Sequence, residues 1–204
     1  MTLAILGQLC LLVYHQVTTW FDLFPFNGVR YTRTRERVIE AIVNLLLMSI
    51  APIGFALGYE ALMKFGLIYY FILFAIECAT WWAPYAFGAS KEWQEVYTRV
   101  HSATINVLPA KDGRPRPNLE HLILMLLTLA VAVSTRYEFA ALHPGPLPSL
   151  WIGWGIGALL TAGTTVQMVY GTRSSVSEAK KANQPSEPTA MSVTPPAAQE
   201  PRQP

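Results

Sequence analysis

Long apolar stretches alternate with short polar connections along most of the chain. Five of them are close to the roughly 20 helical residues that a hydrocarbon core requires, and they span residues 3–20, 38–57, 65–87, 119–135 and 150–170. A short Gly-Tyr-Glu segment separates the second stretch from the third, which predicts a helical hairpin. We therefore predict an all-α fold, a polytopic membrane bundle of five transmembrane helices within residues 1–171.

A shorter amphipathic pattern lies between the third and fourth stretches, at about residues 91–107. Its polar side chains fall on one face, and its apolar side chains recur at helical spacing on the other. These apolar positions are Trp93, Val96, Tyr97, Val100, Ala103 and Val107. The pattern predicts an interfacial helix that lies flat on the membrane, with its aromatic side chains at headgroup level. Asn118, just before the fourth stretch, is predicted to be a helix N-cap.

The last part of the chain has a different composition. Residues 172–204 contain six prolines and no aromatic residue. Such a segment cannot bury enough apolar surface to offset the entropy lost on ordering. We predict a disordered cytoplasmic tail.

Overall composition excludes an ordinary soluble domain. Hydrophobic residues make up 52% of the 204 residues and charged residues 14%, against roughly 25% charged in an average globular protein. The formal net charge of +2 is too small to indicate nucleic-acid binding. The expected partners are therefore membrane lipids, and no nucleic acid is expected.

The distribution of cations predicts an orientation. Thirteen of the fifteen Lys and Arg residues lie in the first and third connections and in the tail, and only Lys64 and Arg136 lie on the other side. By the positive-inside rule this places the N-terminus outside and the C-terminus in the cytoplasm, with the plasma membrane as the expected location. The four arginines of residues 30–37 could instead form a site for anionic lipids.

Polar side chains form stripes along the helices, and their ionisable members fall in the predicted cytoplasmic half. In the first stretch, spacings of seven, four and three place Gln8, His15, Thr19 and Asp22 on one face. The other stripes comprise Glu36, Glu40 and Asn44 on the second helix, Glu77 on the third, and Glu120, His121 and Thr128 on the fourth. Ionisable groups inside a membrane are costly and usually face a partner or a cavity. We predict that these groups meet in one polar chamber between the first four helices.

The candidate residues fall into two groups. His15, Glu77 and Glu40 are the candidate catalytic residues, because an imidazole and buried carboxylates suit proton transfer. The candidate substrate-binding residues are Asp22, Asn44, Trp81, Trp82, His101, Glu120 and His121.

No cofactor is predicted. The HExxH and ExxH metal-binding patterns are absent, as are a phosphate-binding loop and a dinucleotide fingerprint. A metal ion held by His and carboxylate ligands from separate helices stays an alternative. In the fifth stretch, Gly153 and Gly157 form a GxxxG pair that suits either packing within the chain or a homo-oligomer.

Three interpretations of function follow. The first is an acid–base enzyme, or a binding protein, for a lipid-like small molecule. The second is a structural or assembly subunit of a membrane complex, in which the polar groups only join helices. The third is a proton-coupled transporter, which would also need a polar route through the outer half.

Overall fold

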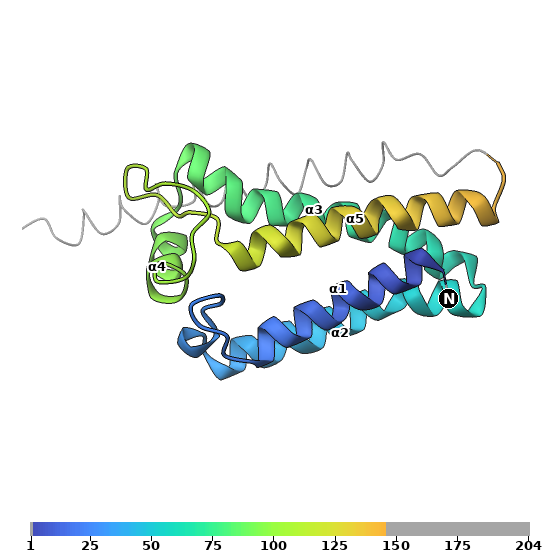
Figure 1. Ribbon diagram of the computed structural model, residues 1–204, viewed down its shortest axis with the longest axis horizontal. Coiled ribbons are helices and arrows are strands. Elements are labelled where there is room, and N and C mark those ends of the chain that lie inside the picture. The colour runs from blue at the N-terminus through green and yellow to red at the C-terminus, as the bar shows by residue number, and fades with distance from the viewer. Residues whose placement is uncertain (1, 146–204) are drawn as a thin grey trace, which may run out of the picture. The chain divides into compact units, whose positions relative to one another are not determined.

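The computed structural model describes residues 2–145, and the regular elements among these residues are helices (Figure 1). Among them the only strand-like pairing is a single bridge between Asn106 and Asn118. The predicted fifth span at 150–170, with Gly153 and Gly157, and the predicted tail lie outside the described residues. The helices are α1 (Leu3–Trp20), the 3-10 helix η1 (Val29–Tyr31), α2 (Thr34–Leu57), α3 (Glu60–Phe87), α4 (Lys91–Val100) and α5 (Leu119–Leu142).

Four of the described helices, α1, α2, α3 and α5, are long and apolar enough to cross a membrane. They form a ring in which α1 packs on α2, α2 on α3, α3 on α5, and α5 on α1. The prediction of an all-helical fold with several helices long and apolar enough to span a membrane is thus confirmed for the described part of the chain. Helix α4 and η1 lie together at one end of the ring, which we call the α4 end (Figure 1).

The predicted helix bounds differ from the observed ones mainly where charged residues begin or end a helix. Helix α1 has the predicted bounds, whereas α2 begins at Thr34 and α3 at Glu60, four and five residues earlier than predicted. Helix α5 continues seven residues past position 135, to Leu142. Hydropathy marks only the apolar part of a helix, while backbone hydrogen bonding continues through charged residues such as Arg136.

The prediction of a helix over 91–107 was wrong in its second half, because α4 ends at Val100. Beyond it the backbone pairs with distant segments: Ile105 N–H donates to Pro25 O at 3.0 Å, and Val107 N–H donates to Pro117 O at 3.0 Å. These long-range bonds replace the helical ones.

The apolar face of α4 is turned toward the protein. Tyr97 and Val100 are buried, and Trp93 and Val96 line a cavity inside the bundle. Trp93 and Tyr97 therefore do not occupy the lipid-facing position that was expected of them. An amphipathic pattern indicates that one face is covered, and here the other helices cover it.

The bundle is tightly packed in the half away from the α4 end. Leu11, Met48, Tyr70 and Val131 belong to one buried cluster, and a second cluster around Phe55, Met63, Leu67 and Phe139 lies farther from the α4 end. A Cβ atom at Gly66 would lie 2.6 Å from the Cβ of Ala51, so glycine allows α2 and α3 to approach closely there. From this closed half the helix pairs diverge toward the α4 end (Figure 1).

The connection between α1 and η1 closes part of the α4 end. Asn27 is buried and its side-chain amide donates to the carbonyl oxygens of Thr18 and Phe21, at 2.9 and 2.8 Å, which satisfies the end of α1. A Cβ atom at Gly28 would overlap the backbone carbonyl of Val100 in α4. This loop and α4 therefore form a close-packed roof over the interior.

Candidate functional site

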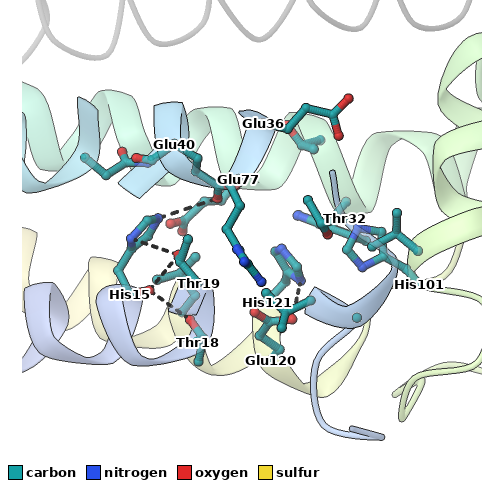
Figure 2. Close-up of a pocket in the computed structure, with 18 of the residues that line it drawn as sticks. His15, Thr18, Thr19, Thr32, Glu36, Glu40, Glu77, His101, Glu120 and His121 are labelled. Atoms are coloured by element: carbon teal, nitrogen blue, oxygen red, sulfur yellow. Dashed lines mark hydrogen bonds and ion pairs between the residues drawn. The ribbon is translucent and has the colours of Figure 1, made fainter. Parts of the chain in front are cut away.

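A polar cavity of about 380 Å³ lies beneath this roof. Side chains from α1, α2, α3, α4 and α5 all line it (Figure 2). Its volume falls within the range of small-molecule sites, about 300–1,000 Å³. Its ionisable lining residues are His15, Glu36, Arg37, Glu40, Glu77, Arg99, His101, Glu120 and His121.

Eight of the ten candidate residues line this cavity. They comprise the three candidate catalytic residues and five of the seven candidate binding residues. They are His15, Glu40, Asn44, Glu77, Trp81, His101, Glu120 and His121. Glu77 and the histidines His15 and His121 come from three different helices and point toward the same space (Figure 2).

Asp22 is not part of the cavity, contrary to the prediction. Helix α1 ends at Trp20, and Phe21 has an extended backbone, so the helical spacing no longer applies to Asp22. Its carboxylate instead accepts from Arg30 Nε at 2.9 Å at the surface of the loop. The hydrogen bond from Arg30 lowers the pKa of Asp22.

Trp82 was also placed wrongly in the site. Trp81 lines the cavity and Trp82 does not, because successive side chains on a helix are rotated by about 100° and Trp82 is directed toward α5. The Trp82 indole donates from Nε1 to the sulfur of Met125 at 3.1 Å, in the α3–α5 contact.

His15 is held by its own helix and faces a carboxylate on α2. The Thr19 hydroxyl donates to the His15 carbonyl at 2.8 Å, which leaves its oxygen free to accept from His15 Nδ1 at 3.4 Å. Nδ1 is thus engaged within α1, and Nε2 is the ring nitrogen on the side of α2. Nε2 lies 3.7 Å from Glu40 Oε1.

Glu77 is the most deeply placed carboxyl group in the cavity. The residue is 7% exposed, and its Oε1 accepts from Thr128 of α5 at 3.0 Å. Its Oε2 is buried and has no hydrogen-bond partner among the described residues. The hydrogen bond to Oε1 thus fixes the side chain, while Oε2 makes no hydrogen bond within the described residues.

His121 is oriented by the residue that caps its helix. The side-chain oxygen of Asn118 accepts from the backbone N–H of His121 at 3.0 Å and lies 2.6 Å from His121 Nδ1. The Asn118 amide donates to Thr104 Oγ1 at 3.1 Å, and the Thr104 hydroxyl donates to the His101 carbonyl at 2.7 Å. This chain fixes the Asn118 amide, so that His121 donates from Nδ1 and keeps Nε2 as an acceptor.

Trp81 is the centre of an aromatic cluster in the cavity wall. Its ring lies 3.8 Å from that of His121, 4.8 Å from that of His101 and 5.5 Å from that of Trp93, measured between centroids. His101 and His121 are themselves 5.3 Å apart. The cluster joins α3, α4 and α5 and holds two imidazoles in fixed positions.

His101 is a neutral imidazole at physiological pH. Burial lowers its pKa to about 4, although the nearby Glu40 carboxylate acts in the opposite direction. A neutral imidazole can accept a hydrogen bond as well as donate one.

Four buried polar atoms on lining residues have no hydrogen-bond partner among residues 2–145. They are Arg37 Nε, Glu77 Oε2, Trp93 Nε1 and His101 Nδ1. Two other such atoms, on Gln8 and Tyr69, belong to residues away from the cavity. An unsatisfied buried group costs about 1–3 kcal/mol, so these four atoms mark the cavity as the polar part of the interior, where water or a ligand can bind.

Sequence reasoning did not assign a site role to several of these residues. The apolar periodicity of 91–107 did place Trp93 on the correct face of its helix, but it gave no sign that this face lines a cavity. Asn118 was expected to cap a helix, and its second bond to the His121 ring requires the tertiary structure. Arg37 also lines the cavity. The only feature of the sequence that pointed to it was its position beside the stripe of Glu36 and Glu40.

The described residues contain no group of three or more His, Cys, Asp or Glu side chains arranged to hold a metal ion. The histidines are instead engaged with Thr19, Asn118 and Trp81. No family model, curated protein or solved structure matches this chain. Its function is therefore inferred from the geometry of the cavity.

Proposed function

We propose that this chain is an integral membrane protein that binds an amphiphilic small molecule in the cavity and carries out acid–base chemistry on it. One observation carries the proposal: histidines and glutamates from four helices line one cavity, and buried polar atoms there have no partner in the fold. Ionisable groups inside membrane proteins usually mark functional sites. A polar ligand would supply the missing hydrogen bonds.

The geometry supports proton transfer more than simple binding. The Nδ1 atoms of His15 and His121 lie within hydrogen-bond distance of Thr19 and Asn118, which leaves the Nε2 atom of each ring for contact with a ligand. Glu77 supplies an unused carboxyl oxygen on the facing helix. A cavity with basic imidazole nitrogens and a carboxyl group on different walls can hold a substrate between a general base and a general acid.

The cation distribution supports an orientation with the cavity on the cytoplasmic side. In the described residues the α4 end carries the arginines of the α1–α2 connection and the cations of residues 91–116. The opposite end has Lys64, which pairs with Glu60 at 2.6 Å, and Arg136. We place the N-terminus outside and the C-terminus in the cytoplasm, in the plasma membrane, by the positive-inside rule.

Two alternative functions receive less support. A proton-coupled transporter needs a polar route through both halves, and the half away from the α4 end is filled by the apolar clusters around Tyr70 and Phe139. A purely structural subunit would gain little from Glu77, because an average polar contact between membrane helices is worth only about 0.6 kcal/mol. Its unpartnered oxygen adds a cost.

The test is native mass spectrometry of the full chain, purified in mild detergent, as wild type and as Glu77→Gln. Glutamine keeps the oxygen that accepts from Thr128, so the fold should be preserved while the carboxyl group is lost. We expect the wild type to retain a lipid-like small molecule and the variant to lose it, and the two proteins to unfold at the same temperature once both are freed of ligand.

Glu138→Gln is the matched control, because Glu138 lies on α5 away from the cavity. It should retain the ligand like the wild type. If the wild type carries no ligand and Glu77→Gln lowers thermal stability, the polar groups only join helices and the proposal is wrong.

A further inference from the structure

The cavity reaches the molecular surface on the side of α2. Its exposed lining residues are Glu36 and Glu40 on α2 and Arg99 on α4. On the side of α1 and α5, the Tyr14 hydroxyl of α1 donates to the Glu120 carbonyl of α5 at 2.8 Å and joins the two helices, and no lining residue from these helices is exposed. A ligand would therefore reach the cavity past α2.

The surface beside this opening is apolar. Ile39, Ile42 and Val43, on either side of Glu40 in sequence, are exposed on α2. In a membrane-spanning helix such residues face lipid. The Glu40 side chain, 54% exposed and 3.7 Å from His15, thus lies between the lipid-facing surface and the interior. Access from the lipid phase suits an amphiphile better than a water-soluble metabolite.

The cavity carries more carboxyl groups than cations. Four glutamates line it, against Arg37 and Arg99. Arg99 lies 3.7 Å from Glu36, so the opposite charges of these two residues offset each other. Of the remaining three, Glu40 lies 3.7 Å from His15 and Glu120 lies 3.7 Å from His121, whereas Glu77 has no ion pair among the described residues. This imbalance favours a cationic ligand.

A second observation separates this group of acids from an ordinary acidic cluster. Glu77 is more than nine-tenths buried and has an unused carboxyl oxygen. It lines the same cavity as the apolar side chains of Met48, Leu73 and Ile76. One wall thus offers a hydrogen-bond acceptor, and the adjoining walls offer apolar contact.

We infer that the ligand is a single-chain amphiphile with a protonated amine headgroup, which enters from the lipid phase beside Glu40. The inference rests on the proposed function and specifies its ligand. The ammonium group binds between Glu40 and Glu77, and the first part of the chain lies against Leu73 and Ile76. A cavity of about 380 Å³ accommodates a headgroup and one chain segment, and an alkylamine is protonated at neutral pH, as lysine is.

The test compares three probes of equal chain length: dodecylamine, dodecanol and dodecanoate. Each is titrated into the full-length protein, freed of bound lipid in detergent, and occupancy is measured by native mass spectrometry. We expect dodecylamine to bind most tightly. Glu77→Gln should weaken it by about thirtyfold, because removing one partner of a desolvated charge pair has that effect. Glu40→Gln should weaken it by only about threefold, because the Glu40 side chain is 54% exposed and solvent screens its charge. Glu138→Gln, away from the cavity, should leave the affinity unchanged.

The possible outcomes separate the two proposals. Dodecanol or dodecanoate could bind more tightly than dodecylamine and lose affinity in Glu77→Gln. That result would overturn the inference of an amine headgroup and would leave the proposal of a ligand-binding cavity intact. If none of the three probes binds the wild type above the level of a Glu40→Gln/Glu77→Gln double variant, both proposals are overturned. Equal effects of Glu138→Gln and Glu77→Gln would show nonspecific partitioning and would also overturn the inference.

Discussion

Asn118 is bonded twice to His121, once through the backbone and once through the imidazole. Its side-chain oxygen accepts from the His121 backbone N–H at 3.0 Å and lies 2.6 Å from Nδ1 of the ring. The residue that begins α5 therefore also fixes the orientation of a histidine in the cavity. Folding of this helix and preparation of the site depend on the same side chain.

Replacing Asn118 by alanine should lower both stability and ligand retention. Loss of an N-cap costs about 1 kcal/mol, and the His121 ring would lose the acceptor that fixes its proton on Nδ1. Thr2→Ala is the control, because it removes the N-cap of α1 at the other end of the bundle. Thermal unfolding and native mass spectrometry should show a stability loss in both variants and ligand loss in Asn118→Ala alone. Equal ligand retention in the two would contradict an orienting role.

Acidification should destabilise the α4 end through His101. Its pKa is about 4 in the folded protein, against about 6.5 for an unperturbed histidine. Between these values the unfolded state binds a proton that the folded state does not, so the free energy of unfolding falls as pH decreases from 6.5 towards 4. The loss is roughly 2 kcal/mol at pH 5.

Thermal unfolding at pH 7 and pH 5 would measure this effect. His101→Gln should lose less stability than the wild type between the two pH values, whereas His143→Gln, at the end of α5 away from the cavity, should behave like the wild type. An unchanged pH dependence in His101→Gln would assign the effect to other groups.

Gly28→Ala should disrupt the roof of the cavity. The added methyl group would overlap the Val100 carbonyl of α4, which is a backbone group and cannot rotate away as the end of a flexible side chain can. We expect a destabilisation of about 1–3 kcal/mol, as for other overpacked sites, together with faster hydrogen exchange in α4. Gly145→Ala provides the comparison, since nothing lies within 4 Å of its added Cβ. Full stability of Gly28→Ala would mean that the loop and α4 are not closely packed.

The bond between Gln8 and Thr135 should act only as a contact between helices. Gln8 Nε2 donates to Thr135 Oγ1 at 2.8 Å, and both residues are fully buried. A double-mutant cycle with Gln8→Leu and Thr135→Val should give a coupling of about 0.6 kcal/mol in detergent stability. Ligand retention should stay at the wild-type level in all three variants. Loss of ligand in either single variant would contradict this prediction and would show that the ligand site includes residues of the packed half.

The helices were predictable because their signals are local. The apolar run from Leu3 to Trp20 gave α1 its bounds, and the Gly-Tyr-Glu segment marked the turn between α2 and α3. The predicted bounds were wrong where a helix continues through charged residues, as α5 does beyond position 135. They were also wrong where a helix ends because its backbone pairs with a distant segment, as happens after α4. Neither event leaves a mark in a short window of sequence.

The candidate site was predictable to the extent that helical periodicity holds. Within α1 and α2 the spacing of four correctly placed His15 with Thr19 and Glu40 with Asn44. The same spacing failed for Asp22, which lies beyond the end of α1 and pairs with Arg30. A periodic argument holds only as far as the helix extends.

The amino-acid sequence alone determined that this chain forms apolar helices with polar stripes, because hydrophobicity and a period of 3.6 residues are properties of neighbouring positions. The tertiary structure decided which stripes face one another. It also decided that Trp81 rather than Trp82 enters the cavity, and that α4 covers the bundle. These outcomes depend on the rotation of each helix about its axis. That rotation is set by close contacts between residues distant in sequence, such as Gly28 with Val100 and Gly66 with Ala51.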